Sequence, residues 1–426
     1  MNKIILKGVN ETLYHEVLPN GLNIYLLPNK QAKNFYISFS THFGSIYTNF
    51  KLNDKEYKIP NGIAHFLEHI TFKMEGGIDA SAVFADLGSS CNAYTSHKVT
   101  CYETMGSSLF KENLDYLLTY VQSPYYTDEI VANEKGIICE EIKMYKDKPG
   151  SRLFDEINKC LFKEANYKYN IAGECEDVNG TTLEDINNTY KTFYHPSNMF
   201  VIITGLFDPE EALTIIKDNQ SKKEFGKPNK IEILSKKEPN EIVKKESIIK
   251  YPVEIDKVSV SIKIPKELFK KLNISDAELT TYMRILMTSN FGKSSILKEQ
   301  LVKDGIIQDG LSVRNDIVDD HIIITILAET KYKEKLIDIL IKQFNNLSIT
   351  EEDFNRKKKV IISEYIQSFD NIELISYLLQ TDLIEYNKII DNYYDLYNNL
   401  DINTMNEIIN LTDVKEMATV ILTREN

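Results

Sequence analysis

Tryptophan is absent from this chain of 426 residues, and there are only five cysteines. Their number is odd and no Cys-x-x-Cys pair occurs, so the sequence offers no disulfide framework and indicates reduced, intracellular use of cysteine in packing. Long hydrophobic runs are also missing. Apolar stretches such as residues 199–207 are far too short to span a bilayer, and the N-terminal one is too short for a signal peptide. We therefore expect a soluble, cytoplasmic protein with no membrane segment.

Positive charge is in deficit, because 50 Lys and Arg stand against 63 Asp and Glu, for a net charge of -13. Such a balance argues against nucleic acid, or an anionic membrane, as the main partner. The hydrophobic share is 42%, which at this length is enough for a sizeable core. The length itself predicts about two to three domains.

Strand and helix patterns alternate along the first half of the chain. Strands are predicted at residues 22–28, 35–44, 89–106 and 199–205, from alternating or continuous apolar residues. Helices are predicted at residues 61–72, 110–124, 127–150 and 208–218, from their start and stop signals. A second α/β half follows, with strands at 258–265 and 321–329 and helices between and after them.

Residues 221–240 are polar, rich in lysine and interrupted by Gly and Pro, which predicts an interdomain linker. The linker separates a first domain (1–220) from a second (241–426). Across it, residues 128–145 align without gaps onto residues 352–369, with shared isoleucines. We therefore predict an α+β protein made of two homologous α/β domains. Glu134 and Glu141 of the first copy meet Lys358 and Tyr365 in the second, so acid chemistry is expected only in the first.

The stretch HFLEH carries the strongest chemical signal. His65 and His69 are four residues apart, which places them about 40° apart on one helix face, where one ion can bridge them. Glu68 lies between them, close enough to take a proton from a metal-bound water without being a ligand. The pattern H-x-x-E-H is found on metallopeptidase helices. A pair of structural histidines on an apolar helix is the alternative interpretation.

A catalytic zinc site needs three protein ligands and one open position, so a third ligand must come from elsewhere. The helix predicted at 127–150 offers Glu134, Glu140 and Glu141. Glu134 and Glu141 are seven residues apart and share a face to within about 20°, whereas Glu140 is turned away by about 100°. Solvated helix carboxylates are the ordinary interpretation of all three, and the spacing does not choose among them.

Four segments in this order resemble a known family: HFLEH, then NAYTS (residues 92–96), then residues 134–145 and 193–211. Together they are similar to the insulinase/pitrilysin-like zinc peptidases, the inverzincins, and within them to the processing-peptidase branch and its bacterial YmfH-like group. The resemblance implies a zinc endopeptidase that cuts short or unfolded peptides. It also implies one Zn2+ per chain, and two domains with antiparallel-rich sheets flanked by helices that form half of a clamshell.

Site roles follow from this resemblance residue by residue. It implies that His65, His69 and Glu141 are the zinc ligands and that Glu68 is the general base. It implies that Glu134 supports the site by orienting a ligand. An extended peptide would pair with the strand formed by Asn92, Ala93, Tyr94 and Thr95.

The second half departs from the family pattern. Active two-domain members carry an Arg and a Tyr in a segment that matches residues 299–310 here, but Val302 stands in the place of the Arg and no Tyr follows. The second domain is thus expected to be a degenerate, metal-free repeat. The resemblance then implies a heterodimer with a metal-free homologous partner chain. A subunit that binds zinc but serves only as a scaffold or peptide-binding chain is the alternative function.

Overall fold

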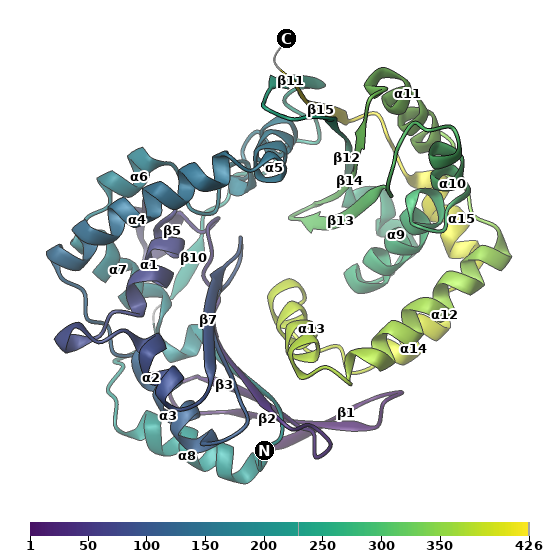
Figure 1. Ribbon diagram of the computed structural model, residues 1–426. Helices are drawn as coiled ribbons and strands as arrows, with labels where there is room; N and C mark the ends of the chain where they lie inside the picture. Colours follow the sequence, from purple (N-terminus) through teal and green to yellow (C-terminus); the bar gives the residue numbers. More distant parts are fainter. Residues whose placement is uncertain (229, 425–426) are drawn as a thin grey trace. The chain divides into compact units, whose positions relative to one another are not determined.

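The computed structural model describes residues 1–228 and 230–424, and the chain divides into two compact units (Figure 1). The first unit consists of Met1–Lys143, Asn170–Ser235 and Ile366–Tyr393. The second consists of Met144–Tyr169, Lys236–Tyr365 and the residues from Tyr394 onward. Each unit therefore includes a segment from the other half of the sequence. The domain boundaries predicted at residues 220 and 241 concern the repeat along the sequence, and they remain a prediction.

A seven-stranded sheet forms the centre of the first unit, in the order β1-β2-β3-β9-β4-β8-β7. Its strands are β1 (Asn2–Leu6), β2 (Glu11–Val17), β3 (Asn23–Pro28), β4 (Phe35–Thr41), β7 (Ser90–Thr95), β8 (Thr100–Gly106) and β9 (Met199–Gly205). Only β3 and β9 pair in parallel; the other neighbours are antiparallel. Strand β7 therefore ends the sheet within the described residues.

Helices pack on both faces of this sheet, so side chains that alternate between the faces of a strand can be buried on either side. One face contacts α1 (Ile63–Thr71), α2 (Ala80–Asp86), α3 (Phe110–Val121) and α8 (Pro209–Ser221). In β3, Ile24 and Leu26 belong to the apolar cluster on that face, whereas Tyr25 and Leu27 belong to a second cluster. The unit also contains α6 (Cys175–Gly180) and α7 (Leu183–Phe193).

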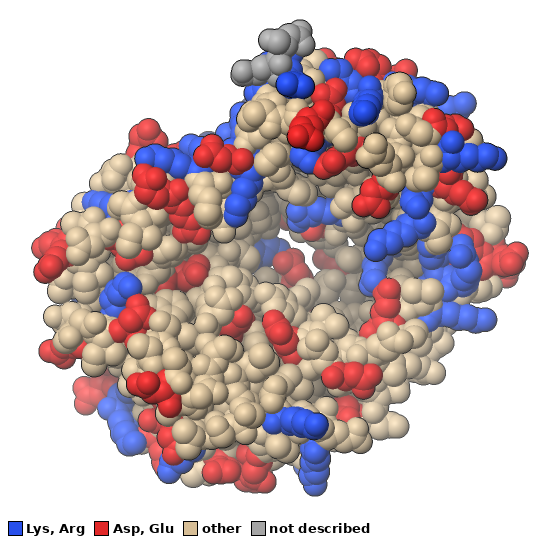
Figure 2. Space-filling view, viewed as in Figure 1, with Lys and Arg blue, Asp and Glu red and all other residues tan. Residues whose placement is uncertain are grey.

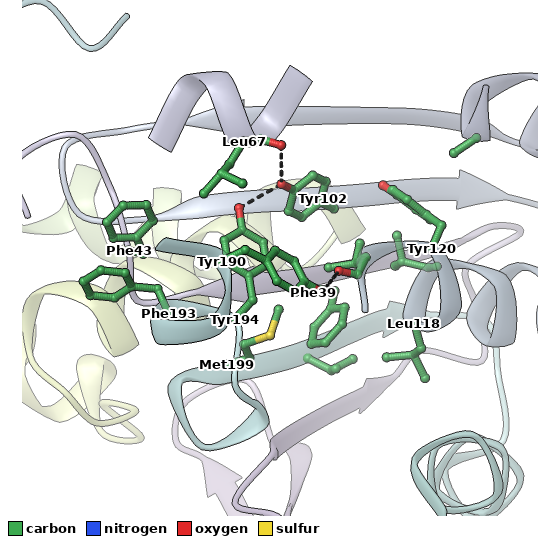
Figure 3. Packing of buried hydrophobic residues seen from close by; sticks show 14 of the residues in the cluster. Phe39, Phe43, Leu67, Tyr102, Leu118, Tyr120, Tyr190, Phe193, Tyr194 and Met199 are labelled. Carbon is green, nitrogen blue, oxygen red and sulfur yellow. Dashed lines mark hydrogen bonds between the residues drawn. The ribbon is translucent and has the colours of Figure 1, made fainter. Parts of the chain in front are cut away.

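Aromatic side chains fill the core beneath α1 (Figure 3). The hydroxyl of the fully buried Tyr102 lies 3.5 Å from the carbonyl of Leu67 in α1 and 2.9 Å from the hydroxyl of Tyr194. The rings of Phe43 and Phe193 stack at 4.1 Å. Phe66, Leu67 and Ile70 of α1 belong to this core, so the inner face of the helix is buried and its opposite face points outward.

The second face of the sheet is covered by α13 (Ile372–Glu385), which comes from the second half of the sequence. Its Ile375, Leu379 and Leu383 lie in the second apolar cluster. Polar bonds accompany this packing, because Thr204 donates to the carbonyl of Ile372 at 2.6 Å and Gln380 donates to the Ser40 hydroxyl at 2.8 Å. Burial on both faces explains why every residue of β4 is buried.

The second unit is built on a five-stranded sheet in the order β11-β15-β12-β14-β13. The strands are β11 (Glu246–Lys250), β12 (Asp256–Pro265), β13 (Ser312–Val318), β14 (His321–Thr330) and β15 (Met417–Thr423). Helix α5 (Pro149–Leu161), from the first half of the sequence, packs on β15 and β12. The remaining helices of this unit are α9 (Asp276–Phe291), α10 (Ile296–Lys303), α11 (Lys333–Phe344), α12 (Glu351–Ser368), α14 (Tyr393–Asn399) and α15 (Ile402–Leu411).

The fold class predicted from the sequence is confirmed: the protein is α+β, with two domains in which helices flank an antiparallel-rich sheet. Two element predictions were wrong. Residues 89–106 form a hairpin of β7 and β8, not one strand, and residues 127–150 form α4 (Asp128–Lys146) and the start of α5. The helix breaks because Lys148, before Pro149, is extended, and proline then occupies the first turn of α5.

The surface carries interspersed charge, as the space-filling view shows for its visible face (Figure 2). No helix in the ranges 1–228 and 230–424 is both long and apolar enough to cross a bilayer. Within the predicted linker, β10 (Ile231–Ile233) pairs with β5 (Asn49–Leu52), which in turn pairs with β6 (Lys55–Lys58). Part of that segment is therefore ordered by pairing with a strand.

Glu238, also in the predicted linker, is buried in the second unit. Its carboxylate accepts hydrogen bonds from the backbone N–H groups of Lys163, Glu164 and Ala165, and pairs with the buried Lys263 ammonium at 2.6 Å. Burial alone would raise the pKa of Glu238, but these bonds outweigh it and lower the pKa. The residue therefore stabilises the fold above the ordinary carboxyl pKa, and this contribution is lost as the pH falls through the lowered value.

Replacing Glu238 by glutamine is expected to lower the free energy of unfolding by about 3–5 kcal/mol at pH 7, because it leaves the Lys263 charge buried and unpaired. The deficit should shrink as the pH falls from the ordinary carboxyl pKa of 4.5 through the lowered pKa of folded Glu238, because the unfolded wild-type chain takes up a proton before the folded chain does. Urea unfolding at several pH values measures both effects. Glu241→Gln, at an exposed position nearby, is the matched control. A deficit equal to that of the control would contradict the assignment.

Candidate metal centre

Helix α1 presents HFLEH with one face in the core and one face outward. Phe66, Leu67 and Ile70 are fully buried, whereas the side chains of His65 and His69 keep 12% and 20% of their surface exposed. The helix begins after Gly62, whose φ of +80° is the left-handed conformation that glycine adopts without strain. A Cβ there would lie 2.2 Å from the carbonyl oxygen of Ala172. Glycine thus allows close backbone contact at the start of the helix.

Helix α4 supplies the carboxylates. Glu141 Oε2 lies 3.1 Å from His69 Nε2 and 3.7 Å from His65 Nε2. Glu140 is turned outward and pairs with Lys143 at 2.7 Å. Of the three glutamates that the sequence left open, the structure brings Glu141 to the two histidines and leaves Glu140 in solvent.

These three side chains form a group with the dimensions of a zinc site. One ligand atom from each of His65, His69 and Glu141 lies within 4.8 Å of the other two. Ligands at tetrahedral positions around zinc lie roughly 3.3 Å apart, so the distances of 3.1 and 3.7 Å bracket the expected value. Two imidazoles and one carboxylate are a donor set that zinc takes in catalytic sites. The residues present therefore fit a zinc ion.

Glu134 orients one of the two histidines. This buried carboxylate accepts a hydrogen bond from His69 Nδ1 at 2.9 Å, which leaves Nε2 directed at the cluster. Burial lowers the pKa of His69, but the Glu134 bond and the charges of Glu68, Glu141 and Glu134 outweigh it, so the net shift is upward. With a carboxylate at each ring nitrogen, His69 needs either a second proton or a metal ion between itself and Glu141.

His65 has a different environment. Burial, together with the charge of His69, lowers its pKa to about 3, so the imidazole is neutral and can act as a ligand. The Nδ1 atom of His65 is buried without a hydrogen-bond partner among the described residues. Only His69 of the pair therefore has a carboxylate that fixes its tautomer.

Replacing Glu134 by glutamine is expected to weaken zinc binding by roughly 10- to 100-fold, because the amide no longer holds the His69 tautomer by charge. Competition with a chromophoric chelator measures the affinity. Glu129→Gln, exposed in the first turn of the same helix, is the control and should bind zinc like the wild type. Equal affinities for the two variants would exclude an orienting role for Glu134.

Glu68 lies next to the cluster and is held by the strand that follows in the sequence. Thr95 of β7 donates to Glu68 Oε2 at 2.7 Å, so the second carboxylate oxygen is left for another partner. Burial raises the pKa of Glu68; the Thr95 bond and the charge of His69 oppose this, Glu141 adds to it, and the net shift is upward. A raised pKa makes this carboxylate a stronger base than that of an exposed glutamate.

Strand β7 places its alternate residues on two different faces. Thr95 points to α1 and Glu68, and Ala93 shares that face by the two-residue period of a strand. Tyr94 points to α13, where its hydroxyl bonds to Gln380 and its ring stacks on Tyr377 at 5.7 Å. Asn92 shares the face of Tyr94 and lies opposite Glu103 of β8. The contribution of α13 was not predicted, since periodicity carries no information on distant partners.

In the second unit, Lys358 and Tyr365 align with Glu134 and Glu141 and make structural contacts. Lys358 donates to the carbonyls of Asn398 and Leu400 at 2.7 and 2.8 Å, and Tyr365 packs in the core. Val302, at the position where the resemblance implies an Arg, is on α10. Within the described residues, His65, His69 and Glu141 form the one group of three or more His, Cys, Asp or Glu side chains that could hold a metal ion.

Comparison with known proteins agrees with this geometry. Residues 26–174, which include all the residues of the cluster, match the family model described as insulinase, peptidase family M16. Residues 181–361 match the model described as the M16 peptidase inactive domain. A Bacillus subtilis protein named as the zinc protease YmfH is 38% identical over 312 residues, which cover 71% of each chain. The chain belongs to the insulinase (M16) family.

Further M16 relatives extend the likeness. The β subunit of a mitochondrial-processing peptidase from Arabidopsis thaliana is 29% identical over 207 residues, covering 47% of this chain and 37% of that protein. Among solved structures, an M16-like peptidase from Alicyclobacillus acidocaldarius is 28% identical, with a TM-score of 0.91 over 99% of this chain and 100% of that chain. The resemblance to zinc peptidases drawn from the sequence motifs is thereby confirmed.

Proposed function

We propose that this M16 chain is a zinc endopeptidase subunit that hydrolyses short or unfolded peptides. The observation that carries the proposal is the convergence of His65, His69 and Glu141 within 4.8 Å, beside the raised-pKa carboxyl of Glu68. Names of zinc proteases among the relatives support the choice of metal. His65 and His69 would hold zinc through Nε2 and Glu141 through Oε2, one ion per chain.

When bound, zinc supplies a Lewis acid for the scissile carbonyl and lowers the pKa of water. The remaining chemistry belongs to the protein. Thr95 fixes Glu68 Oε2, so the other oxygen of Glu68 takes the proton of the attacking water. The same carboxyl, now neutral and stabilised by burial, gives that proton to the leaving amine. Glu134 keeps His69 in the tautomer that binds the metal.

Substrate would pair with β7, because this strand ends the sheet and lies beside the cluster. Backbone hydrogen bonds to Asn92, Ala93, Tyr94 and Thr95 would bind an extended peptide with little sequence demand. Side chains of the added strand opposite Ala93 and Thr95 would face α1, and those opposite Asn92 and Tyr94 would face α13. Alternate substrate residues would thus meet different surroundings.

A second chain is part of the proposal. Val302 replaces the Arg of the family pattern, and the second half matches an M16 domain described as inactive. A metal-free homologous partner would supply the missing substrate contacts, giving a heterodimer. The cytoplasmic location expected from the sequence stays a prediction.

A zinc-binding scaffold subunit is the alternative, and the same missing Arg favours it. Assays of the zinc-loaded chain on unfolded peptides, alone and mixed with a metal-free homologue, separate the two functions. Activity in the mixture alone supports the heterodimer, and activity of the single chain supports an enzyme that needs no partner. Zinc binding without hydrolysis in either assay would overturn the peptidase proposal and support the scaffold.

A further inference from the structure

Two cysteines lie close together near Glu141, the third predicted zinc ligand. Cys139 lies on α4, two residues before Glu141, and Cys175 is the first residue of α6. Each sulfur points at the other residue's backbone: Cys139 Sγ is 3.8 Å from the carbonyl oxygen of Cys175, and Cys175 Sγ is 3.6 Å from that of Cys139. Both are free thiols. The reciprocal contacts place the two residues face to face.

Because each sulfur lies within 3.8 Å of the other residue's carbonyl oxygen, the two thiols share one side of the contact between α4 and α6. An S–S bond would require both side chains to rotate away from these carbonyls. Cys175 is the more exposed of the two, since Cys139 is only 9% exposed.

Cys175 follows a loop that touches the other metal helix. In this bridging loop (residues 170–174), Ala172 and Gly173 lie against the backbone of Asn61 and Gly62 at the start of α1. The contact is so close that a Cβ atom on Gly62 or on Gly173 would clash with the opposite backbone. The bridging loop therefore connects α1, which carries both histidines, with α4, which carries Glu141.

On the α4 side, further contacts secure α6. Lys135 of α4 donates to the carbonyl of Asn179 at 2.8 Å, and Glu174 and Asp177 form a capping box at the start of α6. A covalent link between Cys139 and Cys175 would thus join two segments that are already held in contact.

We propose that Cys139 and Cys175 form an oxidation-sensitive disulfide site that locks α4 to α6, directly after the bridging loop, and so holds the metal-binding helices together. The oxidant is a peroxide. The Cys175 sulfur attacks one peroxide oxygen, which breaks the O–O bond, releases water and leaves a sulfenic acid. The Cys139 sulfur then displaces the hydroxyl group as water and forms the S–S bond. The two thiols lose two electrons and two protons, and hydrogen peroxide becomes two water molecules.

The lock should stabilise the protein, because it closes a loop of about 37 residues between positions already in contact. The melting temperature of the oxidised chain is expected to be about 2–4 °C higher than that of the reduced chain. The rise should disappear on treatment with dithiothreitol. Release of zinc to a chelator is expected to be several-fold slower in the oxidised chain, since Glu141 is on the locked helix.

The test uses the full chain treated with dilute hydrogen peroxide. Peptide mass spectrometry without reduction should find Cys139 linked to Cys175, and either Cys139→Ser or Cys175→Ser should abolish the link and the thermal shift. Cys91→Ser is the control and should behave like the wild type. Absence of the link, or a lower melting temperature on oxidation, would overturn the inference.

The mapping and melting experiments require neither bound zinc nor peptidase activity. This inference rests on the proposed metal site only in the zinc-release measurement. A link that forms in a chain without zinc affinity would overturn the proposed function and leave the disulfide site standing. A chain that binds zinc and is active but forms no link would overturn the disulfide site and leave the proposed function standing.

Discussion

Glu68→Gln is expected to lower kcat for peptide hydrolysis by roughly 10²- to 10⁴-fold, the range that general acid–base catalysis contributes, while zinc content stays at one ion per chain. Glutamine has the same shape as glutamate, and its carbonyl oxygen can still accept the Thr95 hydrogen bond. What it loses is the ability to take a proton. Because Glu68 is predicted not to be a ligand, the metal affinity should barely change.

The measurement combines metal analysis with single-turnover hydrolysis of an unfolded peptide. Thr95→Val is an informative second variant, because it keeps the Glu68 carboxylate but removes the group that fixes it. It should lose less activity than Glu68→Gln, and Thr95→Ser should restore most of the loss. Full activity of Glu68→Gln would sink the proposed role of this residue.

The sequence predicted the position of the site because its signals are local. In α1 the spacing of His65, Glu68 and His69 follows from helix geometry alone, and the structure places the three side chains on the outer face as that geometry requires. In α4 the same reasoning separated Glu140 from Glu141 by about 100°, and Glu140 indeed pairs with Lys143 in solvent. The assignment of Glu141 needed tertiary structure, which the resemblance supplied.

Other features depend on contacts that periodicity does not carry. The turn between β7 and β8, residues 96–99, contains no glycine, proline or asparagine. This turn therefore carries no sequence signal, and residues 89–106 were predicted as one strand. Packing of α13 on the first sheet joins residues far apart in the sequence, such as Tyr94 and Gln380. Glu238 looked like a linker residue because lysines surround it, although its partner Lys263 is buried in β12.

Glu141→Gln is expected to reduce zinc affinity by at least about 100-fold, a larger effect than that of the orienting Glu134. The amide oxygen of glutamine is a weaker ligand than a carboxylate oxygen, and the negative charge that balances the cation is lost. The distances of 3.1 and 3.7 Å from Glu141 Oε2 to the two imidazoles are the physical basis, since no other described carboxylate forms a group with both histidines. Hydrolysis should fall with metal content.

Glu140→Gln is the matched control, because it makes the same chemical change one residue away on the same helix. Its carboxylate faces solvent and Lys143, so zinc affinity and activity should stay at wild-type levels. Dialysis against a graded series of zinc buffers, followed by metal analysis, compares the two variants directly. If Glu141→Gln retains a full complement of zinc under conditions where Glu140→Gln does, the choice of Glu141 as third ligand is wrong. In that event His65 and His69 would have to share the ion with a residue from outside the cluster.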